Sequence, residues 1–485
     1  CKLLVGSWKV RHKQYLLKQA SAFQSIRVKP YTWKLVALIS SLINFVLSLV
    51  LWANFDFSYY GFQFVTELSP FVWGRLGLDG ISIFFVLLTT FTIPICILSS
   101  WDSIKVGIKY FLMNFLILET LLIAVFIVLD LLLFYICFES TLIPMFLIIG
   151  IFGHNETRIR AAYLFFLYTL LGSLFMLLAI LVMYFSAGST DFSLLETTEY
   201  KLEVQKILWA AIFFAFAIKT PLVPFHIWLP LAHTEAPLAG SVVLAGIILK
   251  LAGYGMLRVL VGFFPEASGY FTPLVYTFCV ISIIYTSLTI LRQIDLKSII
   301  AYSSVGHMAI AVLGIFSNSL SGIEGSILLM LAHGIVSPAL FICVGVLYDL
   351  YHTRNMKYYR GLVLHMPVFV CFFFVFILAN MATPLTANFM GETLTFMGAF
   401  KTNPVLTALG ATSIVLSAAY SIWFFNRVSF GAQSIYIKPT GDLNRREFML
   451  LLSLLLLTLL PGIFPNLILD PLHVSVSNLL HSPPF

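Results

Sequence analysis

Thirteen apolar segments constrain this chain more than any other feature of its sequence. Each approaches or exceeds the roughly 20 residues that a helix needs to cross a bilayer. None alternates strictly between apolar and polar residues as a barrel strand does. Only 10% of the residues are charged, against about 25% in ordinary soluble domains. We therefore predict an all-α, polytopic transmembrane bundle with about 13 spans, at residues 33–53, 78–98, 107–129, 131–151, 160–185, 207–229, 239–262, 272–291, 298–317, 322–347, 366–400, 403–425 and 447–469.

The distribution of Lys and Arg predicts the orientation of the bundle. If residue 1 lies inside, the inside segments hold 21 of the 28 Lys and Arg residues and the outside segments hold five. This bias follows the positive-inside rule, and it accounts for the net charge of +7 without a nucleic-acid partner. We expect three regions: a basic segment 1–32 on the inner side, the bundle 33–469, and a tail 470–485 on the outer side.

The six cysteines do not indicate a metal or redox site. Five lie inside predicted spans and no two have C-x-x-C spacing, so we expect them to pack as small apolar residues. The sequence also lacks a P-loop and a glycine-rich dinucleotide motif after a strand. We therefore expect no cofactor to be bound by this chain.

Two of the predicted spans contain proline at positions where a helix must break. Residues 217–230 read AIKTPLVPFHIWLP, so Lys219 is followed by Pro221 and Pro224, and proline lacks the N–H that a helix needs. The pattern returns in outline as ATPL at 382–385. In the predicted topology these two spans run in opposite directions. Interrupted helices at matching places in two halves are typical of inverted repeats in transporters.

Several titratable residues fall inside these spans, most of them near mid-depth. A charged side chain there costs about 2.5–3.5 kcal/mol on insertion scales, so such residues normally face the bundle interior and mark an ion or proton path. The candidate site residues are Glu119, Glu139, Lys219, Lys250, His307 and His333, with Glu392 in the second interrupted span.

These residue types suit proton transfer. Desolvation favours the neutral form of a buried amine and a nearby carboxylate favours its charged form, so we expect Lys219 to act as a proton-holding switch. Histidines pass protons near neutral pH, and the freed backbone groups of an interrupted helix can bind water. Alternatives remain open: Glu119 could simply pair two helices, and we expect His226 and His233 to have packing roles near the inner interface.

Four long motifs carry a resemblance to a known family. They are LLLFYICFESTLIPMFLIIG (131–150), FAIKTPLVPFHIWLPLAHTEAPLAGSVVLAGIILKLAGYG (216–255), RQIDLKSIIAYSSVGHM (292–308) and ILLMLAHGIVSPALFICVGVLYD (327–349). They closely resemble the antiporter-like membrane-arm subunits of mitochondrial NADH:ubiquinone oxidoreductase, respiratory complex I. The resemblance covers about residues 35–480, and subunits of multi-subunit sodium/proton antiporters look similar.

The resemblance implies a proton-pumping subunit and a role for each matching residue. It implies that Glu139 is the carboxylate paired with the switching Lys219, that Lys250 is the central lysine, that His307 and His333 link it onward, and that Glu392 is the exit-side carboxylate. Family members typically have 14 spans, with an apolar helix near the start. Residues 1–30 are polar and basic, so the resemblance implies that this first helix is absent or replaced.

The resemblance also implies a setting. NADH, FMN, iron–sulfur clusters and ubiquinone would be used elsewhere in the complex, and the partners would be other membrane-arm subunits, especially the antiporter-like chains 2 and 5, together with lipids. The location would be the mitochondrial inner membrane, with residues 1–32 in the matrix and 470–485 in the intermembrane space. Three other functions remain open: a sodium/proton antiporter subunit, a non-pumping structural spacer, and direct quinone binding.

Overall fold

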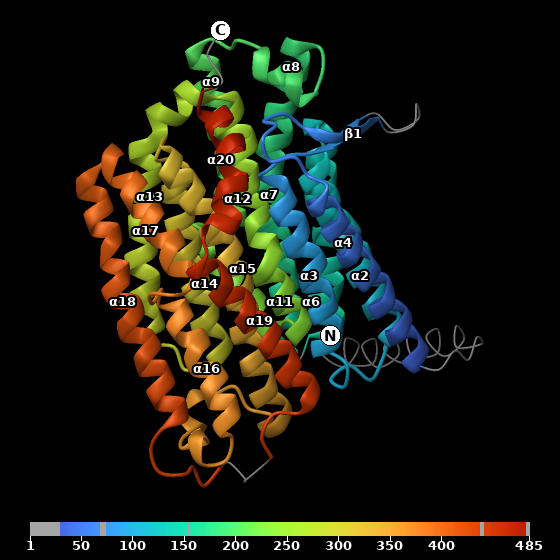
Figure 1. The fold of residues 1–485 in the computed structure, drawn as a ribbon, viewed down its shortest axis with the longest axis vertical. Helices are drawn as coiled ribbons and strands as arrows, with labels where there is room; N and C mark the ends of the chain where they lie inside the picture. Colours follow the sequence, from blue (N-terminus) through green and yellow to red (C-terminus); the bar gives the residue numbers. More distant parts are fainter. Residues whose placement is uncertain (1–29, 68–73, 154, 437–440, 482–485) are drawn as a thin grey trace, which may run out of the picture.

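The computed structural model describes residues 30–67, 74–153, 155–436 and 441–481, and most of them are helical (Figure 1). Residues 1–29, which make up most of the predicted basic segment 1–32, lie outside this range. The strands β1 (Gln63–Glu67) and β2 (Arg75–Leu78) form an antiparallel pair at the upper end of the bundle in Figure 1.

Eleven helical stretches in the described part of the chain are long and apolar enough to cross a membrane. They are α2 (Pro30–Ala53), α3 (Ser82–Ser99), α4 (Ile108–Ile127), α5 (Leu131–Ser140) with α6 (Leu142–Phe152), α7 (Arg158–Ala187), the run α11 (Leu238–Val243), η3 (Leu244–Ile248), α12 (Leu249–Gly255) and η4 (Met256–Val261), α13 (Pro265–Ile290), α14 (Leu296–Ile315), α15 (Leu320–Tyr351), α18 (Pro404–Ser429) and α19 (Arg445–Ile463). We call the run 238–261 the central crossing. Two interrupted crossings complete the thirteen predicted spans, and the predicted fold class is confirmed.

The first interrupted crossing consists of α9 (Leu202–Lys219), η2 (Phe225–Ile227) and α10 (Trp228–Glu235). The helix ends at Lys219, two residues before the first proline. Neighbouring groups satisfy the freed backbone: Trp228 Nε1 donates to the Ile218 carbonyl at 2.9 Å, and the Val223 N–H donates to Ser282 Oγ at 2.9 Å. Such partners are what makes a broken helix tolerable inside a membrane bundle.

The second interrupted crossing consists of α16 (Pro367–Asn380) and α17 (Ala387–Thr402). Ala382 and Leu385 adopt positive φ values of 56° and 74° around Pro384, and Asn388 Nδ2 donates to the Ala379 carbonyl at 2.9 Å. In Figure 1, α9 starts near the upper end of the bundle and α16 starts near the lower end. The two interrupted crossings therefore run in opposite directions, as inverted repeats require.

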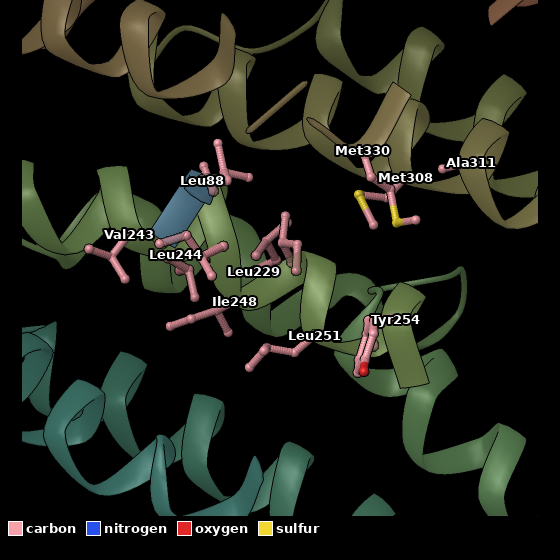
Figure 2. Packing of buried hydrophobic residues seen from close by; sticks show 14 of the residues in the cluster. Leu88, Leu229, Val243, Leu244, Ile248, Leu251, Tyr254, Met308, Ala311 and Met330 are labelled. Atoms are coloured by element: carbon pink, nitrogen blue, oxygen red, sulfur yellow. The ribbon is translucent and has the colours of Figure 1, made fainter. Parts of the chain in front are cut away.

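The core of the bundle lies around the central crossing and α15. The whole 18-residue apolar window of the central crossing and 94% of that of α15 are buried, against 17% for α2. Figure 2 shows Val243, Leu244, Ile248 and Leu251 of the central crossing close to apolar residues of other helices. Peripheral helices expose large apolar side chains, as a lipid-facing surface does.

Two π-helical turns interrupt the central crossing. They occupy Leu244–Ile248 and Met256–Val261, on either side of Lys250. A π turn changes the rotational setting of the helix, and such turns are frequent at functional sites. Nothing in the apolar pattern of this segment predicts them.

The C-terminal part of the described chain is a helix, α20 (Asn466–His481), which follows α19 after a break at Phe464 and Pro465. The predicted tail 470–485 therefore begins inside α20. This helix is held against the bundle, because His473 Nδ1 lies 2.8 Å from Glu324 Oε1 of α15 and Ser475 Oγ accepts from the Gly80 N–H at 3.1 Å. The remaining short helices are α8 (Phe192–Thr197), η5 (Met356–Tyr358) and η6 (Leu362–Leu364).

Candidate functional site

Lys219 lies at the end of α9, directly before the first helix break. It is 1% exposed, and its Nζ donates to the Phe138 carbonyl at 3.1 Å and lies 3.3 Å from the centroid of the Phe138 ring. Glu139, the next residue of α5, interacts with Lys219 electrostatically. No direct ion pair joins the two side chains in the described structure, and Glu139 Oε1 is buried there without a hydrogen-bond partner. Lys219 and Glu139 are therefore near enough to interact electrostatically, but their side chains do not form the expected ion pair.

Lys250 lies on α12, in the centre of the bundle, and is fully buried. Its Nζ is 2.8 Å from His333 Nδ1 of α15 and also donates to the Ala245 carbonyl. Ala245 belongs to the π turn η3, so the irregular backbone supplies one of the two partners of this amine.

His333 and His307 continue from Lys250 to a carboxylate on the second interrupted crossing. Their ring centroids are 5.6 Å apart, and His307 Nδ1 lies 2.9 Å from Glu392 Oε1 of α17. All three side chains are buried. We call Lys250, His333, His307 and Glu392 the proton row, because they form one buried sequence of titratable groups from the central crossing to α17.

A small cavity lies at the Glu392 end of the proton row. It has a volume of about 10 Å³ and is lined by His307, Glu392, Ser413, Ser417 and Tyr420, among others. That volume holds about one water molecule, and the hydroxyl groups would provide its hydrogen-bond partners. The cavity therefore places room for a water molecule next to the Glu392 carboxylate.

Glu119 lies apart from the proton row, where α4 packs on α2. It is fully buried, and Asn44 Nδ2 donates to its Oε1 at 3.2 Å. Among the described residues, no hydrogen bond or ion pair connects Glu119 with the other six candidates. This geometry fits the helix-pairing alternative as well as a role in proton transfer.

Two buried basic residues near the proton row were not among the sequence candidates. His233 is fully buried, stacks on Phe341 with ring centroids 4.6 Å apart, and neither of its ring nitrogens has a hydrogen-bond partner among the described residues. It interacts electrostatically with Lys250 and Lys297, and Lys297 Nζ donates to the Ala236 carbonyl at 2.9 Å. The sequence placed His233 near the inner interface; only the packing of α10 against α15 shows its burial.

The described residues include no group of three or more His, Cys, Asp or Glu side chains arranged to hold a metal ion. What the site offers is a set of proton donors and acceptors in the interior of a helical membrane bundle with two broken helices. These features define a class: polytopic membrane proteins that move protons or small cations.

Comparison with known proteins identifies the family. A family model described as the transmembrane part of NADH:quinone oxidoreductase and Mrp antiporter proteins matches residues 128–417. The NADH-ubiquinone oxidoreductase chain 4 of Mycosarcoma maydis is 62% identical over 452 residues, 93% of each chain. The protein of the same name from Arabidopsis thaliana is 54% identical over 452 residues, which are 92% of this chain and 91% of the relative. The chain therefore belongs to this family of antiporter-like subunits.

Solved structures agree with this assignment. A chain of respiratory complex I from Thermus thermophilus superposes with a TM-score of 0.84 at 31% identity, covering 95% of this chain and 97% of the other. A chain of the Mrp complex from Dietzia sp. has a TM-score of 0.85 at 18% identity, with 96% of each chain covered. At that lower identity the likeness is one of fold alone.

Proposed function

We propose that this chain is a chain 4-type core subunit in the membrane arm of respiratory complex I, where it translocates protons as electrons pass from NADH to ubiquinone elsewhere in the complex. The proton row supports this most directly. Four titratable side chains from four separate helices meet within hydrogen-bond or ring-contact distance in the membrane interior. Burying so many such groups is costly, and proton transfer gives each of them a use.

Lys219 and Glu139 act as the switch at the start of the route. When the Glu139 carboxylate approaches Lys219, the ammonium is stabilised; when the carboxylate moves away, burial favours the neutral amine and the proton leaves. Nζ is held by the Phe138 carbonyl while Glu139 Oε1 remains free. A small movement of α5 at this point would therefore change the charge of Lys219.

The proton row carries a proton held by Lys250 sideways through the membrane. Lys250 passes it to His333 Nδ1, the two histidines exchange it through water, and Glu392 receives it from His307. Each donor returns to its starting form when the next proton arrives. The cavity beside Glu392 gives the proton access to water.

The setting follows from the same proposal. The chain spans the mitochondrial inner membrane many times, carries no redox centre, and depends on flavin, iron–sulfur clusters and ubiquinone in other subunits. Its neighbours are other membrane-arm subunits, especially the antiporter-like chains 2 and 5, and lipids cover the apolar periphery.

The test uses the assembled complex in sealed membrane vesicles. Lys219→Met and Glu139→Gln should each reduce NADH-driven proton translocation by about tenfold or more, since a positioned proton-transfer group contributes about 10²–10⁴-fold to catalysis. Lys206→Met is the matched control. Lys206 lies on the same helix as Lys219, but its Nζ forms an ion pair at 3.4 Å with Glu203, whose side chain is exposed. It should leave translocation unchanged.

Full proton translocation per NADH in both variants would support a structural spacer instead. An antiporter subunit would retain cation exchange without NADH and would not co-purify with flavin and iron–sulfur subunits. Labelling of the chain by a quinone photoprobe would favour direct quinone binding.

A further inference from the structure

The outer end of the central crossing carries a charged cluster that is not part of the proton row. Arg258 lies in η4, eight residues after Lys250, which places it about 12 Å further along the helix. It is 7% exposed and forms an ion pair with Asp79, which is 4% exposed. The basic loops on the other side of the bundle identify this end as the outer one.

The two polar side chains that follow Lys250 on this part of the central crossing, Tyr254 and Arg258, both have partners. Tyr254, one turn after Lys250, donates its hydroxyl to the Phe126 carbonyl at 3.1 Å and accepts from Arg258 Nε at 3.3 Å. The other end of the ion pair is also fixed, because Asp79 Oδ1 accepts from the Ser82 N–H at 2.9 Å. Figure 2 shows Tyr254 among the buried apolar residues of the core.

Further charges surround the pair at the outer rim. Glu196 of α8 interacts electrostatically with Arg258, Asp79 and Asp191; burial raises the pKa of Glu196, and the Arg258 guanidinium partly opposes this. Asp191 Oδ2 pairs with Arg75 Nη2 at 2.5 Å. Arg258 thus pairs with Asp79 and interacts electrostatically with Glu196, two acidic side chains that could otherwise take up a proton.

We propose that Arg258 closes the outer end of the central crossing to protons, so that a proton held by Lys250 leaves along the proton row. A guanidinium does not lose its proton in proteins, so it cannot relay one. By pairing with Asp79, it also withholds the carboxylate that would accept a proton from the Lys250 side. The inference rests on the proposed role of Lys250 in proton translocation.

The closure has a defined consequence when Arg258 is replaced. In Arg258→Gln, the Asp79 carboxylate is freed, the Lys250 ammonium can pass its proton to it through entering water, and Asp79 can release that proton to the outer side. In Asp79→Asn, the same ion pair is lost, but the guanidinium remains and no acceptor is created. Both variants break the Arg258–Asp79 ion pair. They differ only in the charge that remains, which is the Asp79 carboxylate in the first and the Arg258 guanidinium in the second.

The experiment measures passive proton leak. The assembled complex is reconstituted in sealed vesicles with a trapped pH dye, and an imposed pH gradient is followed without NADH. Arg258→Gln should dissipate the gradient several-fold faster than the unchanged complex, while Asp79→Asn and the rim control Arg75→Gln should hold it. The leak assay uses no NADH, whereas the test on Lys219 and Glu139 measures NADH-driven pumping. A negative result for the Arg258 proposal can therefore be distinguished from a negative result for the proposed function.

Two outcomes would overturn the proposal. If Arg258→Gln holds the gradient, the residue is no barrier; if both Arg258→Gln and Asp79→Asn leak, the pair is a structural clamp only. A density map of the unchanged complex gives a check that needs no variant: a continuous chain of ordered waters from Lys250 past Arg258 to the outer surface would also overturn it, and an interrupted chain supports it.

Discussion

At the scale of single residues, the site depends on pairs formed between distant parts of the chain. Lys250 and His333 are 83 residues apart, and His307 and Glu392 are 85 residues apart. Each of these groups is buried, and leaving a buried polar or charged group without its partner is costly. The pairs therefore stabilise the packing of four helices, and they are also the steps of the proposed proton route.

Glu392→Gln tests one of these steps. Gln can still hydrogen-bond to His307 but cannot accept a proton, so NADH-driven proton translocation should fall by about tenfold or more, in line with the contribution of a positioned proton-transfer group. Glu324→Gln is the matched control, since Glu324 is also a buried carboxylate paired with a histidine at 2.8 Å but lies outside the proton row. Equal losses in the two variants would contradict a specific role for Glu392.

At the scale of elements, close helix contact holds the proton row together. α17 approaches α15 at Gly391, next to Glu392, where a Cβ atom would lie 2.8 Å from the backbone of Leu329. A backbone cannot yield as a flexible side chain can, so this contact requires glycine. The irregular backbone of η3 contributes in a different way, by presenting the Ala245 carbonyl to Lys250.

Gly391→Ala should push α17 away from α15 and lengthen the distance between Glu392 and His307. Overpacking of this kind costs about 1–3 kcal/mol, so we expect a lower thermal midpoint for the assembled complex and weaker proton translocation. Gly269→Ala on α13 is the control, because a Cβ there meets nothing within 4 Å. A Gly391→Ala complex as stable and active as the Gly269→Ala complex would disprove this contact argument.

At the scale of the whole molecule, two kinds of ion pair join distant parts of the chain. Arg258 and Asp79 are buried together, whereas Arg446 at the start of α19 meets Asp102, whose side chain is 74% exposed. Breaking a buried pair by removing one partner costs about 3–5 kcal/mol. Exposed pairs contribute about 0–1 kcal/mol.

Asp102→Asn should therefore leave the complex nearly unchanged. We expect a loss of no more than about 1 kcal/mol in stability, which salt would reduce further, and normal proton translocation. The thermal midpoint of the complex at low and high salt measures this. A large drop in the midpoint would mean that the contact between the loop after α3 and the start of α19 holds the two halves of the bundle together.

The thirteen crossings and the two helix breaks were predictable from the amino-acid sequence, because apolar length and proline act locally. The seven candidate residues were named from the same local pattern, and their roles are proposals. Their contacts did not follow from the local pattern; only the resemblance implied that Glu139 pairs with Lys219 and that the two histidines link Lys250 onward. The open Lys219–Glu139 pair, the separate position of Glu119, the burial of His233, the π turns beside Lys250 and the Arg258–Asp79 ion pair all depend on how each helix is rotated against its neighbours. That rotation is set by packing between segments tens to hundreds of residues apart, which no local pattern records, and it alone decides which buried charges meet.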